Sequence, residues 1–146
     1  MMLAVSLTIS LAACAEGPRI EITAPGGEAR ATVSVEIADN SAKREIGLMY
    51  RRNMDEYAGM IFIFGAPAHQ EFWMRNTLIP LDMIFADGAG KIIGIVPIAV
   101  PMTDAVDSVP GDSLYVLEVN GGFCARHGVK PGDLLHFVGF VPKSLD

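Results

Sequence analysis

The apolar run MIFIF, residues 60–64, has the length of a β-strand and lies between Gly59 and Gly65. A short continuous apolar run between turn-forming residues is typical of a strand that is buried on both faces. The run therefore predicts the central strand of a sheet. Upstream, ATVSVEIA, residues 31–38, alternates apolar and polar side chains, which predicts a half-buried strand.

The residues on both sides of these runs predict further strands and little helix. One short helix is expected through AKREIGLM, residues 42–49, with Asp39, Asn40 and Ser41 as N-cap candidates. The stretch NGGFCARHG, residues 120–128, fits a second short helix or a turn. The other predicted strands are HQEFWM (69–74), DMIFAD (82–87), KIIGIVPI (91–98), LYVLEV (114–119) and LLHFVGF (134–140), with DGAG (87–90) as a hairpin turn.

At least six strands and at most two short helices indicate a mainly β (α+β) domain. The expected architecture is a small complex β-barrel or a strongly bent sheet with one or two short helices. Pro97 and Pro101 are expected to end the strand that contains KIIGIVPI, because proline cannot donate to a sheet ladder.

Length and charge limit the possible classes of function. A chain of 146 residues is the size of one domain. Its formal net charge of −6 offers no basic surface to phosphate backbones or anionic lipid headgroups. We therefore expect no nucleic-acid partner, and contact with a membrane only through a lipid anchor or a signal peptide.

Residues 1–15 have the character of an export signal. They are apolar, carry no charge before Glu16 and end in small residues, as a signal peptide does before its cleavage site. LAAC, residues 11–14, resembles the lipobox of bacterial lipoproteins, which makes Cys14 the predicted lipidation site. Cleavage after ACA, residues 13–15, would instead release a soluble periplasmic protein. The expected location is therefore the periplasm, with or without a lipid anchor.

Residues 16–28 are rich in proline and glycine and are predicted to form a tether, although RIEIT, residues 19–23, is suited to pairing in a sheet. A single β-rich domain is expected over residues 29–146. Cys124 is the only cysteine besides Cys14, and we predict a buried, unreactive thiol.

The stretch FWMRNTLIPLDMIF, residues 72–85, sets polar side chains within an apolar run. Asn76 and Thr77 are turn formers, and the Asp82 carboxylate can accept hydrogen bonds from backbone N–H groups. One interpretation is that these groups satisfy the backbone of an irregular crossover. A buried Asp82 then needs a partner such as Arg51 or several N–H donors.

A second interpretation is a site for a small polar ligand. Trp73 offers a flat apolar face beside Asn76, Thr77 and Asp82, a combination found in the lining of sugar sites. The predicted ligand-binding residues are Arg51, Trp73, Asn76, Thr77 and Asp82. Trp73 is then expected to be partly exposed in a cleft, and the partner is a small polar ligand or another component of the cell envelope.

Several motifs resemble the prokaryotic domain-of-unknown-function family 192. They are GLMYRR (47–52), AGMIFIF (58–64), FWMRNTLIPLD (72–82), VLEVNGG (116–122) and HGVKPGD (127–133). The resemblance covers roughly residues 33–138 and implies a compact β-rich domain, often exported or lipid-anchored, without implying a reaction. The family's characteristic positions fall here on Gly47, Leu48, Met49, Arg51, Gly59, Met60, Phe72, Trp73, Met74, Asn76, Thr77, Pro80, Leu81 and Asp82.

Two alternatives to a ligand-binding domain stay open. In the first, Asp82 is the base of a cell-envelope glycan hydrolase, with His69 or Glu71 as its complement. In the second, the domain is a structural accessory module and the polar motif serves folding alone. Beyond this alternative the catalytic residues are left unassigned, and no cofactor is predicted. No metal site is predicted, because the methionines, His127 and His136 lie where core packing or solvation is the ordinary use.

Overall fold

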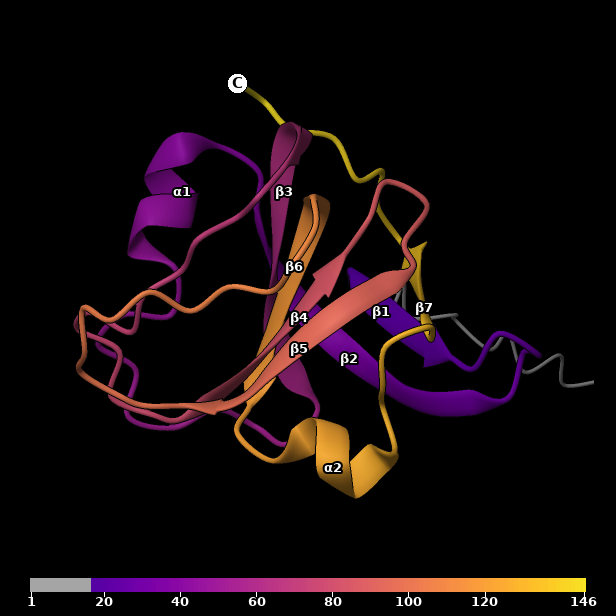
Figure 1. Cartoon of the computed structure of the whole chain (residues 1–146), viewed down its shortest axis with the longest axis horizontal. Coiled ribbons are helices and arrows are strands. Elements are labelled where there is room, and N and C mark those ends of the chain that lie inside the picture. Colours follow the sequence, from indigo (N-terminus) through magenta and orange to yellow (C-terminus); the bar gives the residue numbers. More distant parts are fainter. Residues whose placement is uncertain (1–16) are drawn as a thin grey trace, which may run out of the picture.

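The computed structural model describes residues 17–146, which form one curled sheet and two short helices (Figure 1). The predictions for the export signal and for Cys14 lie outside these residues. Within residues 17–146, neither helix has the length and apolar character needed to cross a membrane. The elements are β1 (Arg19–Thr23), β2 (Ala29–Ala38), α1 (Ser41–Ile46), β3 (Ala58–Ala68), β4 (Leu81–Ala86), β5 (Ile92–Ala99), β6 (Ser113–Asn120), α2 (Phe123–His127) and β7 (Leu134–Val138).

The strand order across the sheet is β5-β4-β6-β3-β2-β1-β7. Neighbouring strands are antiparallel except β2 and β3, which run parallel. The sheet curls until its two edges approach each other: Lys91, just before β5, bridges Leu134 of β7, and the Leu135 N–H donates to the Gly90 carbonyl at 2.8 Å. The result is a half-barrel, which confirms the predicted mainly β class and strongly bent sheet.

The run MIFIF lies in β3, which pairs with β6 on one side and β2 on the other, so the predicted central strand is confirmed. The short helix α1 is also confirmed. It begins after Asn40, whose side-chain oxygen accepts the Lys43 N–H at 3.0 Å, and it ends at Gly47, where φ is 49°. The predicted hairpin turn before β5 is closed by Asp87, whose Oδ1 accepts the N–H groups of Ala89 and Lys91.

Three stretches differ from a plain reading of the sequence pattern. Within the predicted tether, RIEIT forms β1, which its alternation allowed. HQEFWM is not a strand; only Phe72 pairs, as an isolated bridge to Asp107. Its polar start has no buried face to offer, so the chain crosses the sheet instead of extending it. Pro97 lies inside β5 instead of ending it, because β5 is an edge strand with one side unpaired.

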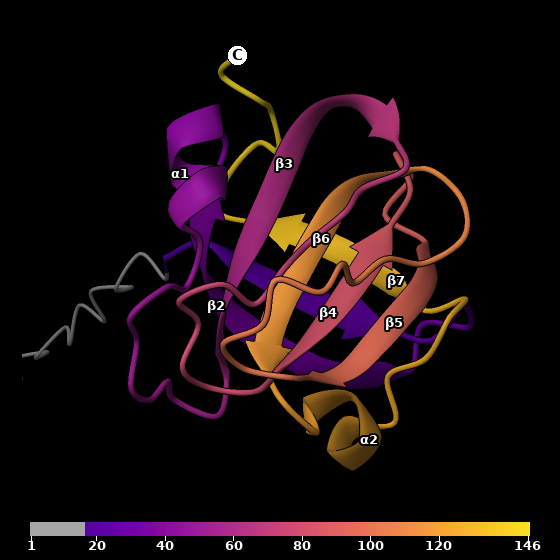
Figure 2. The ribbon, with the colours of Figure 1, turned by 60° about the vertical axis from the view of Figure 1, so that its left-hand side comes forward.

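Successive side chains of the central strands point to opposite faces of the sheet and belong to two separate apolar clusters. In β3, Ile61 and Ile63 belong to a first cluster, to which all seven strands and α2 contribute, inside the curl. Met60 and Phe62 belong to a second cluster on the opposite face. Figure 2 shows β3, β6, β4 and β5 side by side in front, with β7 behind them. The irregular chain before β4 and after β5 covers the second cluster and supplies Met74 and Val109 to it.

Candidate functional site

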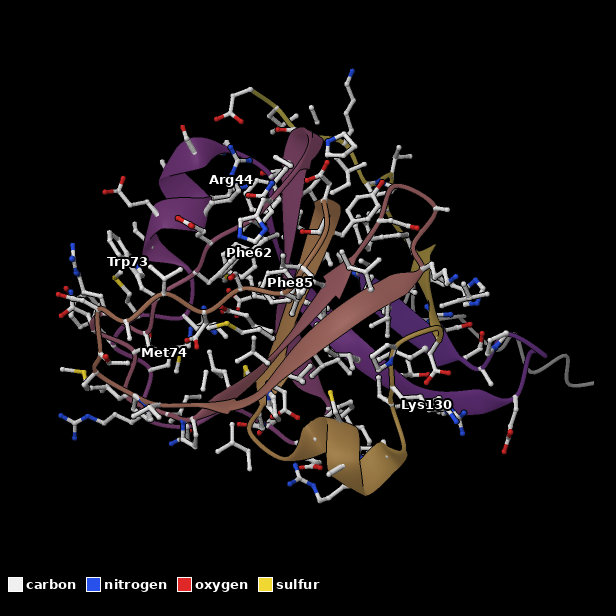
Figure 3. All side chains as sticks on the ribbon, viewed as in Figure 1. Arg44, Phe62, Trp73, Met74, Phe85 and Lys130 are labelled. Carbon is white, nitrogen blue, oxygen red and sulfur yellow. The ribbon has the colours of Figure 1, made fainter. Side chains whose placement is uncertain are left out.

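A cleft of about 400 Å³ opens over the second cluster. Its walls come from α1 and the residues after it, from Phe62 and Phe64 of β3, and from residues 71–73. Figure 3 shows Arg44, Phe62 and Trp73 on the side of the molecule where α1 lies. The volume falls within the range of roughly 300–1,000 Å³ that is typical of small-molecule sites.

Phe72 is the central ring of the apolar wall. Its ring makes edge-to-face contacts with Phe62, Phe64 and Phe85, at 5.1, 6.3 and 5.7 Å between ring centroids. Each aromatic pair of this kind adds about 0.5–1.5 kcal/mol beyond the burial of its area. The rings therefore hold one another in place, and the wall has its shape without a ligand.

Backbone hydrogen bonds fix the chain that carries Trp73. Phe72 and Asp107 exchange N–H···O bonds of 2.9 and 2.8 Å, and the Met74 N–H donates to the Thr103 carbonyl at 3.1 Å. Trp73 thus lies between two anchored residues. The polar loop before β6 positions this wall of the cleft, which is a role that its composition alone did not indicate.

Trp73 stands at the edge of the cleft with 43 % of its surface exposed. The Arg75 guanidinium stacks over the indole ring, 3.8 Å from its centroid, and its Nε donates to Asp104 Oδ1 at 2.8 Å. This pairing also lowers the pKa of the Asp104 carboxyl. The indole is therefore held in one orientation, partly exposed and lining a cleft, as the ligand-site interpretation requires.

Glu118 lies at the floor of the cleft, in the middle of β6. It pairs across the sheet with Met60 of β3 on one side and Met83 of β4 on the other. Directly opposite residues point to the same face, so the Glu118 carboxyl emerges between two thioether side chains. The residue is only 4 % exposed, and within residues 17–146 its carboxyl forms no hydrogen bond or ion pair.

Burial raises the pKa of the Glu118 carboxyl to about 8, because a carboxylate is poorly solvated among apolar side chains. At neutral pH the side chain therefore keeps its proton and presents one O–H donor together with acceptor oxygens. Buried polar groups normally have partners, and an ionisable group with a perturbed pKa in a cleft is a candidate functional residue.

Asp82 lies on the other face of the same sheet. Its neighbours along β4 feed the second cluster, so the Asp82 side chain points toward the first cluster. Its Oδ1 accepts the N–H groups of Ile98 and Gly122 at 2.8 and 2.9 Å, and its Oδ2 accepts that of Cys124 at 2.8 Å. With 1 % of its surface exposed, Asp82 does not line the cleft. The prediction that Asp82 is a ligand-binding residue is therefore wrong.

Arg51 and Asn76 also lie outside the lining of the cleft. Arg51 forms a bidentate ion pair with Glu36, with 2.7 Å from Nη2 to Oε2, so it is not the partner of Asp82. Asn76 has a φ of 54°, and its carbonyl accepts the Tyr50 N–H at 2.8 Å. Asn76 is thus a turn residue that ties one wall of the cleft to the chain after α1.

Of the five predicted ligand-binding residues, the structure places Trp73 and Thr77 in the lining. Thr77 is nearly buried, and its hydroxyl donates to the Arg75 carbonyl at 3.2 Å. Sequence reasoning missed Glu118. Its signal was a lone acidic residue within the apolar strand LYVLEV, since glutamate is almost never fully buried unless it is paired.

The hydrolase alternative required Asp82 to act with His69 or Glu71. Glu71 lines the cleft, whereas Asp82 faces the opposite side of the sheet with both carboxylate oxygens occupied. This pairing is therefore not formed. Among residues 17–146, no group of three or more His, Cys, Asp and Glu side chains is arranged to hold a metal.

Cys124 is buried at the start of α2. Burial, together with the neighbouring Asp82 carboxylate, raises the pKa of its thiol far above the usual range. The reactive thiolate is then absent at neutral pH, which agrees with the predicted unreactive cysteine.

The chain matches the family DUF192, described as "Uncharacterized ACR", over residues 21–137. Similar solved structures include a candidate transcription regulator from Sinorhizobium meliloti 1021, with 40 % identity and a TM-score of 0.80 over 84 % of this chain and 95 % of that one. Another is a protein of unknown function from Novosphingobium aromaticivorans DSM 12444, with 39 % identity and a TM-score of 0.76 over 81 % of this chain and 83 % of that one. A comparison with curated proteins gives no match. Because the family match spans most of the chain, this protein belongs to the DUF192 family, as its motifs predicted.

Proposed function

We propose that this chain is a small-ligand-binding domain of the cell envelope, with its site in the cleft over the second cluster. The observation that carries the proposal is the Glu118 carboxyl, which is buried on the floor of an aromatic cleft without a partner. A polar group in such a place destabilises the fold unless something hydrogen-bonds to it. A bound ligand would supply that hydrogen bond.

The lining specifies the general chemistry of the ligand. Phe62, Phe64, Phe72 and Trp73 offer apolar faces, which suit a compact apolar body. Glu118 is the polar group at the floor, so the ligand needs one polar end that reaches inward. Small-molecule sites generally combine an apolar lining with a few placed polar groups, and this cleft has that composition.

Export to the periplasm, with a lipid on Cys14, remains part of the proposal and rests on the sequence of residues 1–15. In that setting the domain would bind a component of the envelope or a small molecule that enters it.

A function in transcription is suggested only by the description of the Sinorhizobium protein. The net charge of −6 argues against it here, because DNA binding depends on neutralising phosphates with basic side chains. Ligand binding is therefore the function that we propose.

Trp73 makes the proposal testable, because it is the only tryptophan in the sequence and it lies in the cleft. We expect tryptophan fluorescence to shift in intensity or wavelength when the protein is titrated with members of a library of small metabolites and glycan fragments. Val106 lines the cleft and is 58 % exposed, so Val106→Phe should obstruct the cleft without disturbing the core.

The matched control is Val100→Phe, at a residue that is 67 % exposed and outside the lining. Loss of the response in Val106→Phe and its retention in Val100→Phe would support the cleft as the site. If no compound changes the fluorescence, or if both variants respond like the unmodified protein, the cleft is not a ligand site and the structural-module alternative gains.

A further inference from the structure

The charges around the cleft are unequal. Four ionisable residues line it, namely Arg44, Glu45, Glu71 and Glu118. Three of these are carboxyls and one is a guanidinium. An anionic ligand would therefore meet carboxylates at the rim and a carboxyl at the floor, whereas a cation would meet opposite charge at each step of entry.

Arg44 does not offset this imbalance, because its guanidinium is already engaged. Its Nη1 donates to the Ile63 carbonyl at 2.8 Å, and its Nη2 donates to Asp146 Oδ1 at 2.8 Å. The same group lies over the Phe64 ring, 5.1 Å from the centroid. These contacts hold the Arg44 guanidinium against Ile63, Phe64 and Asp146, and it forms no ion pair with Glu118.

We propose that the cleft selects a protonated amine carried on an apolar body, and that Glu118 is the counter-ion that receives it. This inference rests on the proposed function and names its ligand class. An ammonium group supplies N–H donors, which a partnerless carboxylate requires, and aromatic rings attract cations through their faces. Phe62, Phe72 and Trp73 line the same cleft as the carboxyl.

Binding exchanges one cation for another. The empty site holds Glu118 as a neutral acid, and the bound site holds the carboxylate with the ammonium. One proton therefore leaves Glu118 for the solvent for each amine bound, and the net charge of the site stays the same. Because the pKa of Glu118 in the empty site is about 8, protons compete with the amine below that pH.

The other charged groups on this side of the sheet include Glu36 of β2, which lies opposite Met60 and pairs with Arg51. On this face of the sheet, β3 and β4 present only apolar and thioether side chains. α1 contributes Arg44 and Glu45, the chain before Trp73 contributes Glu71, and Asp107 lies opposite Phe72. The lining contains no histidine.

Isothermal titration calorimetry with three probes that share one body tests the inference: 4-phenylbutylamine, 4-phenylbutanol and 4-phenylbutyrate. An alkylamine stays protonated throughout pH 6–8, since its pKa lies near that of lysine, about 10.4. We expect the amine to bind best and its affinity to fall about 10-fold for each pH unit below 8. Titrations in buffers of different ionisation enthalpy should show about one proton released per amine at pH 7.

Glu118→Gln keeps the size of the side chain but cannot ionise. We expect it to weaken amine binding about 10-fold or more at pH 8 and to remove the pH dependence, while the alcohol binds as before. Glu28→Gln, at an exposed residue outside the lining, is the matched control and should leave both the affinity and its pH dependence unchanged.

The outcomes separate this inference from the function on which it rests. Equal, pH-independent affinity for the amine and the alcohol would leave a ligand-binding cleft but overturn the amine selectivity. Preference for the butyrate, or no binding of the amine at millimolar concentration, would also overturn it. A cleft that fails the Trp73 library titration as well would overturn the proposed function itself.

Discussion

Two buried carboxyls lie in neighbouring strands of this sheet, Asp82 in β4 and Glu118 in β6, and they face opposite sides. Asp82 accepts three backbone N–H groups, from Ile98, Gly122 and Cys124. The Glu118 carboxyl accepts none from residues 17–146 and faces a cleft. The two side chains are buried to nearly the same degree, at 1 % and 4 % exposure.

The difference between them teaches that burial alone does not tell a structural acid from a functional one. A carboxylate with several N–H donors stabilises the turn or helix end that supplies them. A buried carboxyl without donors lowers the stability of the fold. Such a residue is kept where a ligand can supply the missing partner. Asp82 belongs to the first kind, and Glu118 belongs to the second.

The largest effect should come from Asp82→Ala. This change leaves the buried N–H of Cys124 and the part-buried N–H groups of Ile98 and Gly122 without an acceptor. We expect a loss of about 3 kcal/mol or more in the free energy of unfolding, measured with urea. Asp112→Ala, at an exposed residue, is the control and should leave stability unchanged. A loss below about 1 kcal/mol for Asp82→Ala would show that the three hydrogen bonds do not hold this part of the fold.

The next prediction concerns the pH dependence of stability, to which the raised pKa of Glu118 should contribute. The folded protein keeps the Glu118 proton up to a pKa of about 8, whereas the unfolded chain releases it near the ordinary value of 4.5. Between these values unfolding releases a proton, so Glu118 lowers stability as pH rises, by at most about 1.4 kcal/mol per unit, and the effect levels off above pH 8.

The comparison between the unmodified protein and Glu118→Gln isolates this contribution, because all other groups titrate in both. The difference in the free energy of unfolding between the two should change steadily from pH 5 to pH 8. A constant difference over that range would mean that the Glu118 carboxyl has an ordinary pKa.

Replacing Glu118 with an apolar residue should have a smaller effect of the opposite sign to Asp82→Ala. Glu118→Leu removes a partnerless polar group and places a methyl-bearing side chain beside Met60 and Met83, so we expect about 1–3 kcal/mol of stabilisation at pH 7. Chemical denaturation measures it. Destabilisation of similar size would instead indicate that Glu118 has a structural partner.

The smallest effect is expected at Arg51. Its ion pair with Glu36 is largely accessible to solvent, and such pairs contribute about 0–1 kcal/mol. Arg51→Ala should therefore change the free energy of unfolding by less than about 1 kcal/mol, with no change in ligand response. A larger loss would show that this ion pair contributes more to stability than solvent-accessible pairs usually do.

The strands could be predicted because their pattern is local. MIFIF, ATVSVEIA and the hairpin before β5 each carry their periodicity or turn residues within a few positions, and each formed as expected. HQEFWM failed because its fate depends on a distant partner, since only Phe72 finds one, at Asp107. Pairing between residues that are far apart in the sequence cannot be predicted from a short window of sequence.

The site was predicted in part, for a related reason. Trp73 and Thr77 lie in the lining because a turn after an aromatic residue is visible in the sequence. The face on which Asp82 or Glu118 emerges depends on the register of three strands, which no local pattern states. Because side chains alternate between the two faces of a strand, a shift of one residue would move a carboxyl from the α2 side of the sheet to the cleft side.

The most direct test of the account is a ¹³C NMR titration of the Glu118 side-chain carboxyl carbon in the protein without ligand, assigned with the Glu118→Gln variant. We predict a midpoint at about 8, far above the ordinary glutamate value of 4.5, and a shift to lower pH on addition of 4-phenylbutylamine. A midpoint near 4.5 that the amine does not change would contradict the claim that Glu118 is a partnerless carboxyl that binds the ligand.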